Sequence, residues 1–324
     1  MRANLIAIFT SVALGAASVP GAHAQTYPAK GLRIVVPFAA GGSTDIFARL
    51  IGDRLGAALG QAVVIDNRPG AAGNIGADAV AKSTPDGYTL LMATTGVMAI
   101  NNALYKNMTY DAGKDLEPVI FVASITNVLI VPADSPLKSV GDLVAAAKSA
   151  PGKLSFASSG AGSSTHMSAE LFKLMAGVDL LHIPYKGSGQ AIPDLISGRV
   201  SMMFENMPGA VSYIKAGKVN ALAVTGLGRT SALPEVRTVA ESGVPGYESL
   251  SWSGIAVASG TPREVIARLN REINAILATP EMRQKLSEQG ADVVGGTPEA
   301  FAEHIKRERE KWSRVVRDAN IVAN

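Results

Sequence analysis

The chain has 324 residues and no cysteine, and its 30 Lys and Arg against 27 Asp and Glu give a formal net charge of +3. A chain of this length is expected to form about two domains, each large enough to bury its own core. The lack of cysteine excludes thiol chemistry and disulfide bonds, and the near balance of charge argues against nucleic acid or an anionic membrane as a partner.

The first residues have the pattern of a secretory signal peptide. Arg2 supplies a positive end, residues 5–19 are apolar, and Ala22-His23-Ala24 has the small-x-small form that signal peptidase recognises. The apolar run is shorter than the ~20 residues that a membrane-spanning helix needs. We therefore expect residues 1–24 to be a signal peptide cleaved before Gln25. A retained membrane anchor is the alternative.

Short β-type runs, most of them followed by a glycine-containing turn or a helical pattern, recur along the rest of the chain. The β-type runs are residues 32–37, 63–66, 89–93, 154–157, 180–185, 200–204, 221–225 and 252–257. Helical periodicity occupies residues 46–59, 165–175, 265–277 and 301–316. Ser43 or Thr44 is predicted to cap the first helix, and Met167 and Met175, on one helix side with Leu171 and Leu174, are expected in the core. This alternation predicts an α/β fold with largely parallel sheets.

No low-complexity linker separates the two expected domains. We therefore expect the chain to cross between two lobes more than once on ordered segments, which makes a hinge rather than a flexible tether. The candidate crossings are residues 120–127 and 247–253. They divide the chain into lobe 1, residues 25–125 plus 250–324, and lobe 2, residues 126–249.

Sequence signatures of common catalytic sites are missing. The chain has no G-x-S-x-G, G-x-x-x-x-G-K-[ST] or H-E-x-x-H motif, and Gly160-Ala161-Gly162 lacks the third glycine of G-x-G-x-x-G. After the signal segment the histidines are His166, His182 and His304, and no two are spaced to bind one metal from one helix face. We predict no cofactor, no metal site and no enzymatic activity.

Loops rich in Gly, Ser and Thr follow several predicted strands, at residues 38–45, 94–96, 158–166 and 185–190. A helix N-terminus after such a loop offers free N–H groups and the positive end of the helix dipole, so it can hold an anion without Lys or Arg. In open α/β sheets ligands bind at the carboxyl ends of strands, where these loops lie. One loop set from each lobe would therefore grip a carboxylate from both sides of a cleft.

Each loop also has a purely structural explanation, because glycine is often needed for the turn and hydroxyl side chains often cap helices. His166 either donates a hydrogen bond to a ligand carboxylate or serves in capping or packing. For Asp45 we favour ordering of loop N–H groups, or pairing with a base, over ligand contact. The alternative function from another class is a secreted hydrolase that uses Ser158, Ser159 or Ser163 with His166. The sequence shows no third residue that would orient the histidine and activate the serine.

The segment PFAAGGSTD at residues 37–45 resembles the signature loop of the Bug, or TctC-like, family, the extracytoplasmic solute receptors of tripartite tricarboxylate transporters. Further segments are similar to that family in order and spacing: DNRPGAAGNIGA (66–77), STPDGYTL (83–90), SSGAGSSTHMSAELF (158–172), PYKGSGQAIPDLISGRV (184–200) and ALAVTGLGRTSALPEVRTVAESGVPGYE (221–248). The resemblance covers essentially the whole mature chain.

This resemblance implies a type II periplasmic-binding-protein-like fold, with two α/β lobes, a hinge and a ligand cleft between the lobes. It implies a periplasmic receptor for a small carboxylate, such as a dicarboxylate, a tricarboxylate, an amino acid or an aromatic acid. Membrane subunits of a transporter would be its partners, and we expect the receptor itself to be a monomer. A ligand sensor that docks to a signalling partner is the alternative.

In receptors of that family the first loop and ordered water hold one ligand carboxylate, and the second-lobe loops complete the pocket. Two departures bear on ligand choice. Glu205 stands where the family often has Asp, and Val97-Met98 replaces a more polar stretch, which favours an apolar ligand body. The predicted ligand contacts are Phe38, Ala39, Gly41, Gly42, Ser43, Asp45, Thr94, Thr95, Ser158, Ser159, Thr165, His166, Tyr185, Gly187, Gln190 and Glu205.

Overall fold

The computed structural model describes residues 27–318 and 321–322, and the predicted signal peptide, residues 1–24, lies outside the described residues. The strands are β1 (Leu32–Val36), β2 (Val63–Asn67), β3 (Thr89–Thr94), β4 (Leu116–Pro132), β5 (Ser155–Ser158), β6 (Leu181–Pro184), β7 (Met202–Asn206), β8 (Val219–Val224), β9 (Leu250–Ala258) and β10 (Ala291–Val293). The helices are α1 (Ser43–Leu59), α2 (Asn74–Ala81), α3 (Asn101–Leu104), α4 (Val140–Ser149), α5 (Ser164–Ala176), α6 (Ser188–Ile196), α7 (Met207–Lys215), α8 (Arg263–Ala278), α9 (Pro280–Glu288) and α10 (Pro298–Asp318). Within this part of the chain, no helix combines the length and the apolar character needed to cross a membrane.

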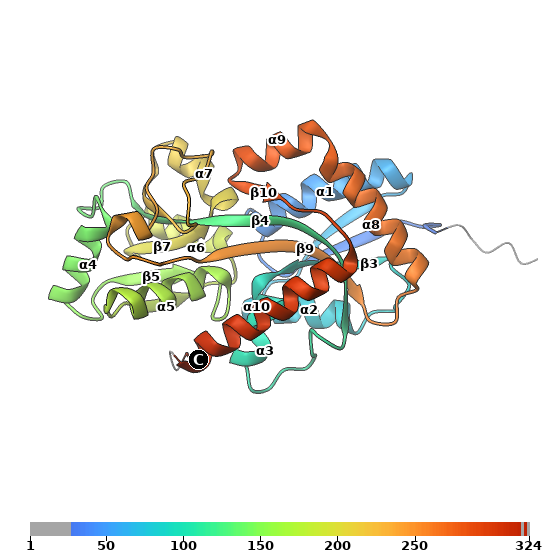
Figure 1. Ribbon diagram of the computed structural model, residues 1–324, viewed down its shortest axis with the longest axis horizontal. Coiled ribbons are helices and arrows are strands. Elements are labelled where there is room, and N and C mark those ends of the chain that lie inside the picture. Colours follow the sequence, from blue (N-terminus) through green and yellow to red (C-terminus); the bar gives the residue numbers. More distant parts are fainter. Residues whose placement is uncertain (1–26, 319–320, 323–324) are drawn as a thin grey trace, which may run out of the picture.

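Two lobes share one long strand, β4 (Figure 1). The first lobe has the strand order β2-β1-β3-β9-β4 with β10 added at β4, and the second has β6-β5-β7-β4 with β8 also paired to β4. Strand β1 is parallel to β2 and β3, and β5 is parallel to β6 and β7. Every strand pair that includes β4 or β9 is antiparallel. The predicted α/β class is confirmed. The prediction of largely parallel sheets is wrong outside the two sets of βα units.

Strand β4 connects the two sheets because it changes partners along its length. From Leu116 to Thr126 it pairs with β9, and from Asn127 onward it pairs with β7 and β8. Strand β9 brings the chain back along β4 into the first lobe (Figure 1). Strand β9 runs opposite to β3 in the first lobe, and β4 runs opposite to β7 in the second lobe. Each sheet is therefore mixed.

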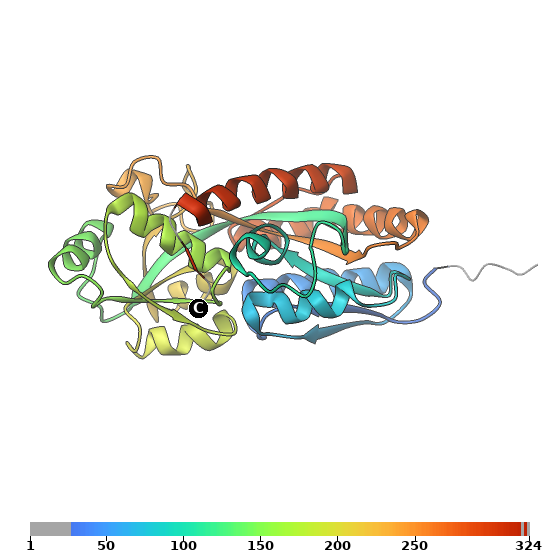
Figure 2. The same cartoon turned by 90° about the horizontal axis from the view of Figure 1, so that it is seen from below.

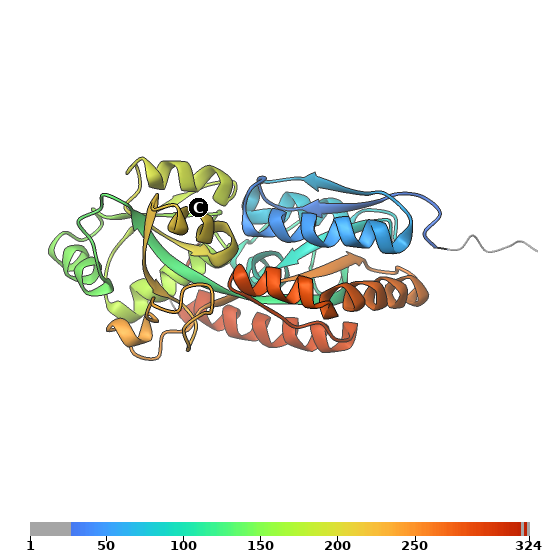
Figure 3. The same ribbon diagram turned by 90° about the horizontal axis from the view of Figure 1, so that it is seen from above.

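Each lobe buries apolar side chains on both faces of its sheet, with helices on either side (Figures 2 and 3). In the first lobe, α1, α8 and α9 pack on one face, and α2, α3 and α10 pack on the other. In the second lobe, α4 and α5 cover one face, and α6 and α7 the other. Because each lobe has its own apolar core, the lobes can move as units about the strands that join them.

Two local predictions are corrected by the structure. Neither Ser43 nor Thr44 caps α1; the N-cap is Gly42, whose backbone is extended, and the Ser43 hydroxyl bonds elsewhere. Met167 is fully buried as predicted, whereas Leu174 and Met175 are 56% and 40% exposed. Both exposed residues lie in the last turn of α5, which reaches solvent.

Candidate functional site

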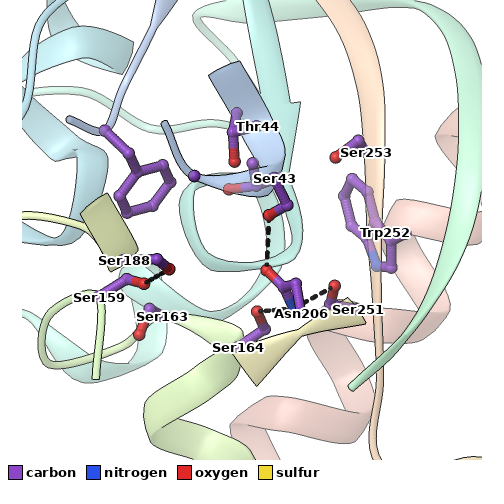
Figure 4. A pocket seen from close by; sticks show the side chains of 13 residues that line it. Ser43, Thr44, Ser159, Ser163, Ser164, Ser188, Asn206, Ser251, Trp252 and Ser253 are labelled. Atoms are coloured by element: carbon purple, nitrogen blue, oxygen red, sulfur yellow. Dashed lines mark hydrogen bonds between the residues drawn. The ribbon is translucent and has the colours of Figure 1, made fainter. Parts of the chain in front are cut away.

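A small cavity of about 30 Å³ lies between the lobes (Figure 4). By volume it has room for about two water molecules, so the lobes are closely apposed and a larger guest requires them to separate. None of the lining residues, all from the described part of the chain, carries a charged side chain. The lining is Phe38, Gly42, Ser43, Thr44, Thr94, Ser159, Ser163, Ser164, Ser188, Asn206, Ser251, Trp252 and Ser253.

Four helix N-termini converge on this cavity. The N-caps of α1, α5 and α7 are Gly42, Ser163 and Asn206, and each of them lines it. Helix α6 begins at Ser188, which also lines it. The first turn of each helix has N–H groups without partners inside the helix, and the aligned peptide dipoles add partial positive charge there. The cavity therefore favours an anion without any cationic side chain.

The loop before α1 is ordered by Asp45. Gly41 has φ 86°, a left-handed conformation that favours glycine, and its N–H donates to Asp45 Oδ2 over 3.0 Å. Arg49 and Asn67 also donate to this carboxylate. Burial alone would raise the pKa of Asp45, but hydrogen bonds from Arg49, the Gly41 N–H and Asn67 lower it below its usual value. Asp45 thus fixes the loop and stays ionised.

The lobes contact each other directly beside the cavity. Ser43 Oγ donates to Asn206 Oδ1 over 3.1 Å, and the Ala39 N–H donates to the Lys186 carbonyl oxygen over 3.3 Å. Gly187 has φ 148°, and a Cβ atom on it would stand 2.9 Å from the Ala39 nitrogen. These contacts make the described conformation a closed one.

Asn206 is held in one orientation by its amide nitrogen. Nδ2 lies 2.9 Å from Ser251 Oγ and 3.3 Å from Ser164 Oγ, and it also donates to Asn127 Oδ1. Because every contact of Nδ2 is an acceptor, Oδ1 is the atom that faces Ser43 across the cleft (Figure 4). The amide is therefore a fixed part of the cavity wall.

One hydroxyl in the wall has no partner. Thr94 Oγ1 is buried and makes no hydrogen bond within the described residues, although buried polar atoms almost always do. Thr94 lines the cavity together with Thr44 and Ser253. An orphaned hydroxyl at this place is available to a polar group of a ligand.

Aromatic side chains supply the apolar part of the wall. Phe38 is 9% exposed, and Trp252 is 3% exposed with its Nε1 donating to Glu308 Oε2 over 3.2 Å. Val97 and Met98 are buried in the first-lobe core and do not line the cavity. The cavity wall therefore gives no support to the expectation that these two residues shape the ligand body.

Five of the predicted contacts line the cavity: Phe38, Gly42, Ser43, Thr94 and Ser159. The other eleven do not line it. These are Ala39, Gly41, Asp45, Thr95, Ser158, Thr165, His166, Tyr185, Gly187, Gln190 and Glu205.

Several of these residues brace the loops. Thr95 Oγ1 accepts from the Trp252 N–H over 2.9 Å, and Thr165 Oγ1 accepts from the Ser159 N–H over 2.9 Å. Tyr185 donates to Asp194 over 2.8 Å, and Gln190 is exposed. They hold the wall in place from outside.

His166 does not contact a serine hydroxyl through its ring. Its Nδ1 accepts from the Gly162 N–H over 3.1 Å, and its Nε2 lies 3.6 Å from a Glu170 oxygen. Ser158 is fully buried, and its Oγ lies 2.6 Å from His182 Nε2. Burial lowers the pKa of His182 to about 3, so this imidazole is a weak base. The arrangement lacks the exposed, activated serine that a hydrolase needs.

Eight lining residues are not among the predicted ligand contacts: Thr44, Ser163, Ser164, Ser188, Asn206, Ser251, Trp252 and Ser253. Of these, the sequence offers Thr44 as a helix cap and Ser163 as a nucleophile of the alternative hydrolase. Four of the eight lie in loops that the sequence marks, and Asn206 is the last residue of β7. The last three lie on β9, and its Ser251 and Ser253 alternate with Ser249, which directly precedes the strand; all three serines are buried. Serines at every second position of a predicted strand were the signal that could have found Ser251 and Ser253.

Comparisons with known proteins agree with this geometry. A family model described as the tripartite tricarboxylate transporter family receptor matches residues 47–321. The protein in the tcbD-tcbE intergenic region of a Pseudomonas species is 41% identical over 315 residues, covering 97% of this chain and 94% of that one. Protein BugT of Bordetella pertussis is 39% identical, covering 97% and 96%.

Two solved structures are also similar. R. palustris Rpa4515, solved with adipate, has a TM-score of 0.89 at 42% identity, covering 91% of this chain and 99% of that one. MatC from Rhodopseudomonas palustris, solved with bound malate, has a TM-score of 0.86 at 32% identity, covering 90% and 100%.

Proposed function

Since the chain belongs to the tripartite tricarboxylate transporter receptor family, we propose that it is a periplasmic solute-binding protein that delivers a small organic carboxylate to membrane transporter subunits. The observation that carries this proposal is the convergence of four helix N-termini on a cavity without charged side chains. A carboxylate gains charge-assisted hydrogen bonds there, whereas a cation meets no counter-charge.

The ligand we propose is a dicarboxylate. One carboxylate lies against the hydroxyls of Ser43 and Ser159 and the N–H groups at the N-terminus of α1. The body of the ligand lies against Phe38 and Trp252, whose rings suit methylene groups. The adipate and malate of the two structural neighbours are both dicarboxylates and support this class.

Binding closes the cleft by rotation about β4 and β9. Under this proposal lobe 1 comprises residues 25–125 plus 250–324, and lobe 2 comprises residues 126–249. A ligand that contacts both lobes favours a closed form, wider than the described conformation by the volume of the ligand, through its differential affinity for that form. Micromolar affinity corresponds to about 8 kcal/mol, which a few charge-assisted hydrogen bonds and buried methylene groups can supply.

The location follows from the N-terminal segment of the sequence. Residues 1–24 serve as a signal peptide cleaved before Gln25, and the mature monomer works in the periplasm. The closed form is the one that membrane subunits recognise. A sensor that docks to a signalling protein would use the same cleft and differ in its partner alone.

A screen of thermal stability against carboxylates tests the proposal. A ligand at 100 times its dissociation constant adds about 2.7 kcal/mol to the stability of the native state, which raises the melting temperature by several degrees. Aliphatic dicarboxylates are expected to give this shift, and the matching diamines are not. No shift with any aliphatic, amino-acid or aromatic carboxylate, using protein refolded to remove carried-over ligand, would count against the receptor.

A further inference from the structure

Glu205 stands behind the wall of the cavity and reaches it through two serines. The side chain lies on β7 and is fully buried. Its Oε2 is 2.7 Å from Ser188 Oγ, and Ser188 Oγ is 2.9 Å from Ser159 Oγ. Both serines line the cavity. We call these three residues the carboxyl–serine chain.

The surroundings of Glu205 do not favour its charged form. Its Oε1 has no hydrogen-bond partner within the described residues, which is costly for a buried carboxylate. Burial raises the pKa of Glu205 to about 8, against smaller lowering effects from Ser188 and the Asn206 backbone. Glu205 is therefore mostly a neutral carboxylic acid at neutral pH.

No charged side chain compensates for this burial. The titratable residues of the helices that pack against β7 are His166, Glu170 and Lys173 on α5, Asp194 on α6, and Tyr213 and Lys215 on α7. None of them is among the groups that shift the pKa of Glu205. Strand β5 and the part of β4 that pairs with β7, Asn127 to Ile130, contain no titratable residue.

The protonation state of Glu205 decides which way the hydrogen bonds run, because each serine hydroxyl has one hydrogen. When Glu205 is ionised, Ser188 donates its hydrogen to Glu205, so Ser159 must donate its own hydrogen to Ser188. Ser159 then presents only lone pairs to the cavity. When Glu205 is neutral, it donates to Ser188, Ser188 donates to Ser159, and the Ser159 hydrogen is free to point into the cavity. An anion in the cavity is repelled by the first arrangement and bound by the second.

We propose that Glu205 is a positioning residue that couples carboxylate binding to protonation, so that the closed receptor holds one proton on Glu205 for each carboxylate at Ser159. The inference rests on the proposed carboxylate function and adds a pH dependence to it. No bond is broken, and the proton comes from solvent. At pH values well above the pKa of Glu205, the affinity for the carboxylate falls tenfold for each pH unit, because each binding event must take up one proton.

Calorimetric titration with adipate in pairs of buffers that differ in ionisation enthalpy measures this proton directly. At about pH 9 the wild-type protein is expected to take up close to one proton per adipate bound, and at about pH 7 close to none. Binding with no proton uptake at either pH would overturn the inference and leave the carboxylate receptor intact. Failure to bind adipate or any other dicarboxylate at either pH would instead remove the proposed function.

The variant Glu205→Gln separates this role from a structural one. Glutamine is close in shape to the neutral acid and always has a donor for Ser188, so its affinity for adipate should hardly change between about pH 7 and about pH 9. The matched control Glu235→Gln alters an exposed carboxylate and should keep the wild-type pH dependence. A Glu205→Gln variant that is folded yet retains the wild-type loss of affinity, about tenfold between pH 7 and pH 9, would overturn the inference. If this variant does not fold, the proton count of the wild-type protein decides.

Discussion

Ser43 and Asn206, which stand 163 positions apart in the sequence, join the two lobes by a hydrogen bond of 3.1 Å from Ser43 Oγ to Asn206 Oδ1. Each of them lies at the N-terminus of a helix, α1 in the first lobe and α7 in the second. The bond therefore brings the positive ends of two helix dipoles together at one wall of the cavity. A carboxylate beside this bond would neutralise both ends, which is why closure and anion binding should depend on each other.

Asn206→Asp places a negative charge in this wall with almost no change in shape. The change should weaken binding of a dicarboxylate by about 100-fold, roughly 3 kcal/mol, because two carboxylates would share a site without a cation. Calorimetry with adipate measures the loss, and circular dichroism checks that the variant is folded. Asn107→Asp makes the same change at an exposed position and should bind as the wild-type protein does. Equal affinities for the two variants would argue that the ligand carboxylate lies elsewhere.

Gly189→Ala tests closure separately from folding. A Cβ atom on Gly189, in α6 of the second lobe, would stand 2.2 Å from the Ala40 carbonyl oxygen in the first lobe. Within α6, alanine is a better helix former than glycine, so the second lobe itself should not suffer. We expect about 10- to 100-fold weaker binding, from a contact cost of roughly 1–3 kcal/mol in the closed form alone.

Small-angle scattering provides the structural readout for this variant. Wild-type protein with adipate should have a smaller radius of gyration than the Gly189→Ala variant at the same adipate concentration. Gly228→Ala is the matched control, because a Cβ atom there meets nothing within 4 Å. A Gly189→Ala variant that compacts and binds as the control does would show that the two lobes need not approach this closely.

Trp252 should report the ligand by fluorescence. The sequence has two tryptophans, Trp252 at the cavity and Trp312 in the core, and both donate to Glu308 Oε2. In the Trp312→Phe variant the emission comes from Trp252 alone and should change when adipate binds. In the Trp252→Phe variant the remaining emission should stay nearly constant. A response of equal size in both variants would mean that the signal arises from a global change.

His182 should make the second lobe sensitive to acid. Burial lowers the pKa of His182 to about 3, compared with its usual 6.5. Between these two values the unfolded chain binds more protons than the folded chain. The contribution of His182 to the free energy of unfolding is therefore fully present above about pH 6.5 and is lost as the pH drops toward 3. The variant His182→Gln keeps an acceptor for Ser158 but does not titrate. Its urea unfolding free energy should therefore fall less steeply between pH 7 and pH 4, and parallel slopes would contradict the assignment.

The sequence predicts the βα units well because glycine and small polar residues mark the end of each parallel strand. It does not reveal strand direction at β4 and β9, since an apolar run looks the same when it pairs parallel or antiparallel. It also does not reveal which residue of a loop faces inward: Ser188 lines the cavity, whereas Gln190 is exposed. The approach of Ser43 to Asn206 depends on how the lobes pack, and no local pattern encodes it.

The most direct test of the account compares adipate with adipamide, its neutral counterpart of nearly the same shape, in calorimetric titrations at about pH 7. A cavity built from helix N-termini and hydroxyl groups should bind adipate at least about 100-fold more tightly, because charge-assisted hydrogen bonds to the anion are roughly twice as strong as neutral ones. Equal binding of the two compounds, or tighter binding of the diamide, would contradict an anion-selective cavity.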